Sequence, residues 1–115
     1  TQLAGIEALK GSQDSVNKMI HEFQERRDFL VTELNKIKNV SCVSPGGAFY
    51  VFPKINKNNQ KSKDISNFLL EKKFVATVPG SSFGIKGEGF LRISYASKLE
   101  NLKKFVNLLN EYMNE

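Results

Sequence analysis

Several residue types are nearly absent from the 115-residue sequence, which has one cysteine, one histidine, three prolines and no tryptophan. The single cysteine, Cys42, cannot form an internal disulfide and is typical of a reducing compartment, so we expect a cytoplasmic protein. One histidine, His21, cannot build the ligand cluster that a metal site needs, and we expect no metal. The longest apolar runs extend over only a few residues, so we expect no membrane-spanning segment.

Arginine is also scarce, with three arginines against fourteen lysines in a chain of net charge +5. Four of the lysines, at positions 54, 57, 61 and 63, lie in one polar segment that has no acidic residue before Asp64. A solvated loop is the simplest interpretation of this segment, and a basic surface for nucleic acid is the alternative. The 40% hydrophobic content and the nine phenylalanines predict a packed core, and the length is that of one domain.

The hydrophobic periodicity predicts the order helix, strand, strand, helix, strand, strand, helix. Residues 2–10 are helical in composition and end at Gly11, for which we expect a left-handed conformation. An amphipathic helix, capped by Ser12 or Asp14, then runs to about Lys38 and would be nearly 40 Å long. We expect strands over 40–43, 48–52, 74–78 and 90–96. A further helix is expected over 64–72, and a last helix begins at the capping box formed by Ser97 and Glu100.

This order predicts a two-layer α/β domain of the α+β type, with a small sheet of three or four strands and helices mostly on one face. A compact chain of this length has a diameter of roughly 35 Å, so the long helix would extend along the whole domain and either continue into another domain or brace against it. We therefore expect residues 1–11 to be the end of a linker or large-domain helix, and residues 12–115 to form one small domain.

The stretch 78–96 contains the strongest candidate for chemistry. Half of the eight glycines lie in its first part, and a strand follows in which Leu91, Ile93 and Tyr95 share one face. Arg92 points to the opposite face. In a chain so rich in lysine, an arginine inside a strand indicates a planar, two-pronged grip on a carboxylate or phosphate. A surface ion pair with a neighbouring acid is the alternative for Arg92.

Two other interpretations of the glycine-rich stretch concern nucleotides and RNA. The glycines lack the Gly-Lys-Ser/Thr ending of a phosphate-binding loop, and they precede a strand where such loops precede a helix. Residues 86–93 partly match the RNP1 pattern of RNA-recognition modules, in which a strand aromatic such as Phe90 would stack on a base beside the basic loop. Glu88 and Ile93 stand where this pattern has aromatic residues, which disfavours RNA binding.

Two longer motifs resemble one known family. Residues 46–53 read GGAFYVFP, and residues 78–96 contain VPG, FG, GEG and FLRISYA in that order. Together with Arg26-Arg27-Asp28 and Leu34-Asn35, they are similar to the carboxy-terminal part of class I aminotransferases, fold-type-I enzymes that use pyridoxal 5′-phosphate. The resemblance extends over essentially the whole chain, and the subgroup that the chain most resembles is that of the bacterial-type aspartate aminotransferases.

The resemblance implies roles for individual residues. Arg92, in the pattern Leu-Arg-Ile-Ser, would bind the α-carboxylate of the substrate, in agreement with the grip expected from its residue type. Phe49, in the pattern Gly-Gly-Ala-Phe, would approach the mouth of the active site. The turn at Pro79 and Gly80 would shape the approach to Arg92.

Other parts of the family's catalytic machinery have no match in this sequence. The lysine that binds the cofactor lies in a serine-rich motif upstream of the matched region, and neither Ser62-Lys63 nor Ser97-Lys98 has its context. The groups around the cofactor's ring nitrogen and phosphate also belong to the large domain. The resemblance therefore implies a fragment that binds no cofactor covalently and is inactive alone.

The complete enzyme would transfer an amino group between an amino acid such as aspartate and a 2-oxo acid, with pyridoxal 5′-phosphate as its cofactor. The resemblance further implies a homodimer that acts on small molecules, without nucleic acid or membrane as a partner.

Overall fold

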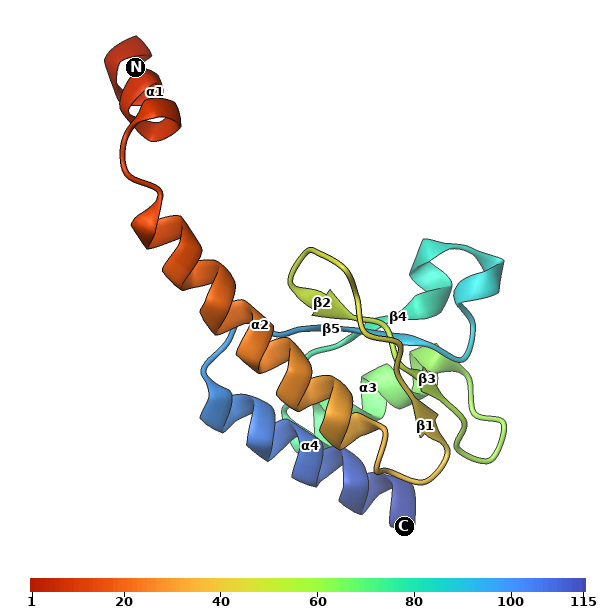
Figure 1. The fold of residues 1–115 in the computed structure, drawn as a ribbon. Coiled ribbons are helices and arrows are strands. Elements are labelled where there is room, and N and C mark those ends of the chain that lie inside the picture. Colours follow the sequence, from red (N-terminus) through yellow and green to blue (C-terminus); the bar gives the residue numbers. More distant parts are fainter.

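The computed structural model describes the whole chain, residues 1–115. Figure 1 shows its helices, its short strands and the two 3-10 turns near the end of the sheet. The helices are α1 (Gln2–Lys10), α2 (Asp14–Leu34), α3 (Ser62–Lys73) and α4 (Leu99–Asn114). The strands are β1 (Val40–Ser41), β2 (Tyr50–Val51), β3 (Lys54–Ile55), β4 (Val78–Pro79) and β5 (Leu91–Ser94), and the 3-10 turns are η1 (Gly80–Phe83) and η2 (Ile85–Gly87).

Strand β5 is the centre of the sheet. It pairs antiparallel with β2 on one side and with β4 on the other, which gives the strand order β2-β5-β4. In this register Tyr50 lies opposite Ser94, and Val78 lies opposite Arg92. β1 and β3 form a separate antiparallel pair, and an isolated bridge joins β3 to the residue that precedes β5.

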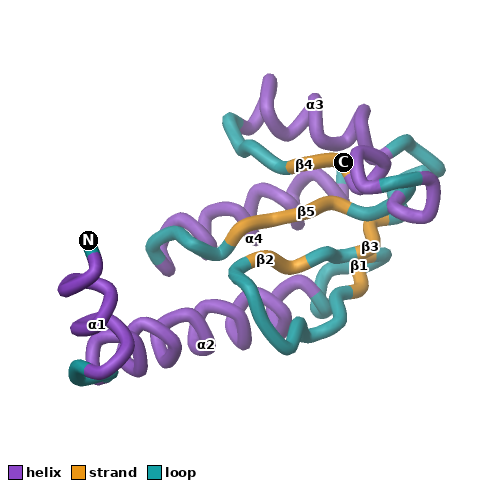
Figure 2. Tube along the Cα trace, turned by 90° about the horizontal axis from the view of Figure 1, so that it is seen from above, coloured by secondary structure: helices purple, strands orange, loops and turns teal.

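The core lies between this sheet and three of the helices (Figure 2). Leu91 and Ile93 of β5 are buried, and so is Tyr95 just beyond the strand. The helices contribute buried apolar side chains to the same cluster: Leu30 and Leu34 from α2, Ile65 and Leu69 from α3, and Leu102, Phe105, Val106 and Leu109 from α4. The predicted two-layer α+β architecture is therefore confirmed, and Cys42 is the small core residue that its apolar neighbours indicate.

Helix α1 and the first half of α2 form an arm that projects from the body of the domain (Figure 1). No residue of α1 is buried, and the only buried residues of α2 are Leu30 and Leu34 near its end. The Cα radius of gyration is 16.7 Å, whereas a compact chain of this length has about 13 Å. Large apolar side chains remain exposed along the arm: Leu3, Ile6, Leu9, Val16, Met19 and Ile20. None of the helices combines the length and the hydropathy that crossing a membrane would require.

Several regular elements are shorter than the sequence predicts, whereas α3 extends beyond the expected 64–72. α2 ends at Leu34 rather than near Lys38, and of the strand expected over 74–78 only Val78 lies in a strand, at the start of β4. The strand expected over 48–52 is confined to β2, while β3 forms in the segment 54–63 that was expected to be a loop. A strand persists only where a partner lies beside it, and this pairing depends on distant segments rather than on local pattern.

The predicted ends of three helices are also wrong. The residue in the capping position of α2 is Gln13, rather than Ser12 or Asp14, and its side chain makes no capping hydrogen bond. Gly11 has φ −72° and ψ 179°, which is extended backbone rather than the left-handed conformation. The capping box of Ser97 and Glu100 does not form, because α4 starts at Leu99 and the residue in the capping position is Lys98. Ser97 lies one position too early and its hydroxyl instead accepts a hydrogen bond from the side-chain amide of Asn101.

Candidate functional site

Arg92 lies in the middle of β5 on the face of the sheet opposite the core, as the alternation predicts. Its neighbours Leu91 and Ile93 are 0% and 5% exposed, whereas Arg92 is half-buried and Ser94 is exposed. Tyr50, which lies opposite Ser94 in the register, comes from β2 onto the same outer face. The outer face of the sheet therefore carries the candidate site.

Two aromatic rings contact the guanidinium of Arg92. Its Cζ atom lies 4.8 Å from the ring centroid of Tyr50 and 4.8 Å from that of Phe83 in η1. A cation over an aromatic ring is attracted by the ring's electron-rich face, by about 0.5–1 kcal/mol at an exposed position. The two rings, which come from segments on either side of β5 in space, hold the end of a long side chain in place.

Arg92 is the one arginine of the chain without a carboxylate partner. Arg26 pairs with Glu22 at 3.3 Å and Arg27 pairs with Asp28 at 2.8 Å. No Asp or Glu oxygen lies within 4.0 Å of the Arg92 guanidinium, so the alternative of a surface ion pair is wrong for this residue. A guanidinium fixed between rings, with its N–H groups free, is well suited to bind an anion that comes from outside the chain.

More aromatic rings extend the surface around Arg92. Phe52 and Phe90 stack with ring centroids 5.2 Å apart and an interplanar angle of 8°, and Phe52 meets Phe83 edge to face at 6.0 Å. Phe52 and Phe83 are still 39% and 52% exposed. Phe52 and Phe83 were not predicted to be part of the site. For Phe52 the available signal was the alternation about the buried Val51, which puts the aromatic residues on both sides of it onto the outer face.

The glycine-rich stretch is a folded loop that carries Phe83 to Arg92. The backbone N–H of Gly80 donates to the carbonyl oxygen of Phe90 at 2.7 Å, which closes the loop. Gly80 and Gly87 lie backbone against backbone and leave no space for a Cβ atom on either. The glycines of this loop therefore allow it to fold tightly beside the sheet.

Phe49 immediately precedes β2 and lies beside Tyr50. Its ring is 43% exposed and lies 4.5 Å from the ring of Tyr50 and 6.4 Å from the ring of Phe23 on α2. The structure thus brings Phe49 and Arg92, the two residues singled out from the sequence, into one cluster connected through Tyr50. The role of Phe49 at the mouth of an active site stays a prediction.

Three lysines bear on whether the chain could hold pyridoxal 5′-phosphate. Lys63 and Lys98, each preceded by a serine, are exposed. Lys57 is buried, but its ammonium group donates to the backbone carbonyl of Tyr112 and lies 4.2 Å from the centroid of that tyrosine's ring. No buried side-chain nitrogen or oxygen lacks a hydrogen-bond partner, so no buried polar group is left over for the cofactor's phosphate or ring. Nor do three or more His, Cys, Asp or Glu side chains gather as a metal site.

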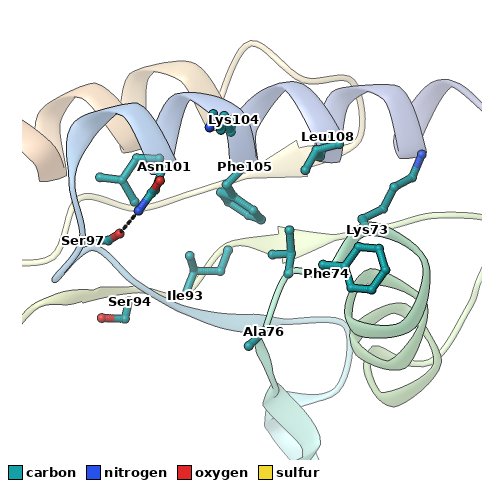
Figure 3. A pocket seen from close by; sticks show the side chains of 12 residues that line it. Lys73, Phe74, Ala76, Ile93, Ser94, Ser97, Asn101, Lys104, Phe105 and Leu108 are labelled. Carbon is teal, nitrogen blue, oxygen red and sulfur yellow. Dashed lines mark hydrogen bonds between the residues drawn. The ribbon is translucent and has the colours of Figure 1, made fainter.

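A groove of about 480 Å³ lies between α4 and residues 74–76, beside β5 (Figure 3). Its lining includes Ile93 and Phe105 from the core side, and Lys73 and Lys104 as its only charged residues. Arg92 is not part of it. The sequence did not predict this groove, which lies where the expected strand over 74–78 does not pair with the end of β5.

Comparisons with known proteins point to one family. The family model described as "Aminotransferase class I and II" matches residues 1–109. The chain is 41% identical over 112 residues to the aspartate aminotransferase of Pyrococcus horikoshii. It is 44% identical over 119 residues to a probable aspartate/prephenate aminotransferase of Aquifex aeolicus. Among solved structures, an alanine aminotransferase from Pyrococcus furiosus has a similar fold, with a TM-score of 0.92 at 32% identity.

The matched regions cover most of this chain but a minor part of each relative. The match covers 96% of this chain and 29% of the Pyrococcus horikoshii protein, and 99% of this chain and 30% of the Aquifex aeolicus protein. For the Pyrococcus furiosus structure the corresponding shares are 98% and 29%. The chain thus spans less than one third of the length of the curated relatives that it matches.

Proposed function

This chain belongs to the class I and II aminotransferases, and we propose that it forms the part of such an enzyme that binds the α-carboxylate of the substrate through Arg92. The observation that carries the proposal is the state of this guanidinium, which is held between Tyr50 and Phe83 and has no acid partner. Two N–H groups of a guanidinium match the two oxygens of a carboxylate in one plane. A lysine ammonium cannot reproduce this geometry.

One carboxylate site would serve both halves of an amino-group transfer. The amino acid and the 2-oxo acid each carry a carboxylate beside the reacting carbon, so Arg92 would hold either substrate by the same group. Because two rings already restrict the guanidinium, little side-chain entropy is lost when a substrate binds. A fixed carboxylate in turn orients the reacting carbon, which lowers the barrier by positioning. Phe49 would line the mouth of this site and help to exclude water.

Pyridoxal 5′-phosphate would supply the electron chemistry of the reaction in the complete enzyme. The residues of this chain do not fit that cofactor, since none of its buried polar groups is without a partner. We therefore assign residues 12–115 to the small domain of a longer aminotransferase, and residues 1–11 to the end of a helix of its other part. In this proposal the chain is inactive by itself. A homodimeric assembly and a cytoplasmic location stay predictions.

Aspartate is the amino acid that we propose as the donor. Both curated relatives named above carry aspartate in their names, one of them together with prephenate. The similar solved structure is named as an alanine aminotransferase, so a small aliphatic donor is the competing choice. Steady-state rates of the intact enzyme with aspartate, alanine and phenylalanine at one fixed 2-oxo acid would rank these donors.

Replacement of Arg92 by lysine tests the carboxylate site in the intact enzyme. We expect Arg92→Lys to raise KM for both substrates and to lower kcat/KM by about 10- to 100-fold, because a two-pronged, charge-assisted contact is lost. Arg26→Lys is the matched control, since Arg26 makes a partly exposed ion pair with Glu22 on α2 and lies over the ring of Phe23. Kinetics of Arg92→Lys equal to those of the control would overturn the assignment.

A spectroscopic titration tests whether the chain needs another part to hold the cofactor. We expect pyridoxal 5′-phosphate, mixed with the 115-residue chain, to give no stoichiometric change in absorbance. A saturable change at one equivalent, removed by replacing a single lysine, would mean that a cofactor lysine lies in this chain after all.

RNA recognition is the second candidate function and stays a prediction. The observation that favours it is the exposed pair of rings, Phe52 and Phe83, beside an arginine on the outer face of a sheet. A titration of the chain with single-stranded RNA at moderate salt decides it. Saturable micromolar binding that Phe90→Ala abolishes would support RNA recognition, and binding that falls away with salt without saturating would reject it.

A further inference from the structure

Helix α3 begins without a capping residue of its own. Its N-cap position is occupied by Lys61, whose side chain has no oxygen to accept the free N–H groups of the first turn. The acceptor is instead Glu88, 26 residues further along the chain, whose Oε1 accepts the backbone N–H of Ser62 at 2.6 Å. A carboxylate at this place also interacts favourably with the positive end of the helix dipole.

The same carboxylate connects α3 to the end of the glycine-rich loop. Oε1 of Glu88 also accepts the backbone N–H of Gly89 at 3.1 Å. A second contact lies close by, where the hydroxyl of Ser62 donates to the hydroxyl of Ser81 in η1 at 3.3 Å. Ser62 is 1% exposed, so the first turn of α3 is a fixed point of the fold to which both ends of the loop are attached.

Phe83 lies between these two attachments. It ends η1, and its ring contacts the guanidinium of Arg92 at 4.8 Å and the ring of Phe52 at 6.0 Å. If the loop moves away from α3, Phe83 moves with it and its contact with Arg92 loosens, because the half-exposed ring belongs to the loop.

We propose that Glu88 is a positioning residue of the carboxylate site: by joining the glycine-rich loop to the first turn of α3, it holds Phe83 against Arg92. This inference rests on the proposed function of Arg92, and Glu88 itself touches neither Arg92 nor its ligand. Tyr50, which lies on the other side of the guanidinium, is held by the sheet and does not depend on Glu88.

The charges that face Glu88 predict how the site responds to acid. The hydrogen bond from Ser62 and then that from Gly89 lower the pKa of Glu88, and the nearby Lys61 acts in the same direction. Lys54 and Lys61 line the same hollow as Glu88. Lys86 lies two residues before Glu88 on the loop, and Asp64 lies in the first turn of α3, whose Ser62 donates to Glu88. The hydrogen bond between the Glu88 carboxylate and the backbone N–H of Ser62 is therefore complete at neutral pH. It is lost only below the ordinary pKa range of a glutamate.

Nuclear magnetic resonance of the 15N-labelled 115-residue chain reads the position of Phe83 directly. The Nε–H signal of Arg92 is shifted by the ring currents of its two aromatic neighbours. In Glu88→Ala we expect this signal to move toward the position of a free arginine, and in Glu88→Gln to stay close to its wild-type position, because the amide oxygen still accepts the N–H of Ser62. In the wild type the signal should move with the Ser62 amide as pH falls through the pKa of Glu88, and this acid response should vanish in Glu88→Gln. Glu100→Ala, in the first turn of α4, is the matched control and should behave as the wild type.

Kinetics of the intact enzyme give the second measurement. We expect Glu88→Ala to raise KM for the amino acid about tenfold with a smaller change in kcat, since a displacement of about 1 Å already costs up to ~100-fold in a positioned site. Glu88→Gln should restore most of the loss. The inference would be overturned if Glu88→Ala kept both the wild-type Arg92 signal and the wild-type KM. It would also be overturned if the Arg92 signal of Glu88→Gln still moved at acid pH. This second test does not require the alanine variant to fold. If Arg92→Lys raises KM and Glu88→Ala does not, only this inference fails; if Arg92→Lys has no effect, the proposed function fails instead.

Discussion

Gly80 and Gly87 approach each other so closely that a Cβ atom on either residue would overlap the backbone of the other. The contact closes the loop that carries Phe83, and both glycines are buried. Neither residue has a positive φ, so the need for glycine comes from lack of space and not from backbone conformation.

The first prediction concerns this close approach. We expect Gly80→Ala to lower the free energy of unfolding by about 2 to 3 kcal/mol, because backbone atoms cannot move aside as a flexible side chain can. Urea unfolding followed by circular dichroism measures this loss. Gly47→Ala is the control and should change stability by less than about 0.5 kcal/mol, since nothing lies within 4 Å of a Cβ at that position. Equal stability of the two variants would show that the loop opens at little cost.

Phe74 provides a prediction of increased stability. It ends α3 with φ 55° and ψ 36°, in the left-handed region that suits glycine, and its side chain is 90% exposed. Phe74→Gly should therefore raise the free energy of unfolding by about 0.5 to 1 kcal/mol, because strain is removed and almost no burial is lost. Thermal unfolding compares this variant with Asn39→Gly at φ 63°, where the gain should be smaller since asparagine tolerates this region. A lower melting temperature for Phe74→Gly would mean that the ring contributes contacts in the groove of Figure 3 that outweigh the strain.

Lys57 closes the carboxyl end of α4. Its ammonium group donates to the carbonyl of Tyr112, one of the last carbonyls of the helix, and lies over that residue's ring. We expect Lys57→Ala to destabilise the chain by about 2 kcal/mol, since a hydrogen bond, a cation–π contact and a favourable charge at the negative end of the helix dipole are lost together. Chemical unfolding should show a change within about 0.5 kcal/mol for the exposed Lys63→Ala in the same basic segment. A loss of similar size in both variants would point to net charge rather than to this contact.

The phenol of Tyr95 makes the stability of the folded chain depend on pH in the alkaline range. Burial raises the pKa of its phenol, and Asp28 acts in the same direction while Arg27 opposes it. Because the folded chain binds this proton more tightly than the unfolded chain, stability is complete below the ordinary tyrosine pKa of about 10 and falls as pH rises above it. Tyr95→Phe should flatten this alkaline decline and cost about 1 kcal/mol at neutral pH, because the hydrogen bond to the carbonyl of Ala48 at 2.9 Å is lost.

Melting temperatures measured between pH 8 and pH 11 separate the titration of the Tyr95 phenol from the loss of its hydrogen bond. Burial raises the pKa of Tyr112 as well, so part of the decline should remain in Tyr95→Phe. An alkaline decline identical to that of the wild type would assign the whole effect to Tyr112 and contradict the prediction for Tyr95.

The fold was predictable from the sequence where a local period is enough. Except for β3, which forms where a loop was expected, the order of helices and strands follows from spacing along each element, and so does the outward direction of Arg92. Element ends were less predictable. Of the strand expected over 74–78 only Val78 pairs with β5, because the length of a strand depends on how far its partner stays beside it.

The outward direction of Arg92 follows from the strand pattern alone, since successive side chains of a strand point to opposite faces whatever lies next to them. Its surroundings depend on the folded chain: Tyr50 and Phe83 are 42 and 9 residues away in the sequence and meet the guanidinium only once β2 and the glycine-rich loop are in place. The partners at two helix ends also come from distant segments. Glu88 accepts the backbone N–H of Ser62 at the start of α3, and Lys57 donates to the carbonyl of Tyr112 at the end of α4. Local patterns determine the direction of a side chain, and the partners of a polar group depend on chain segments that come together only when the whole domain folds.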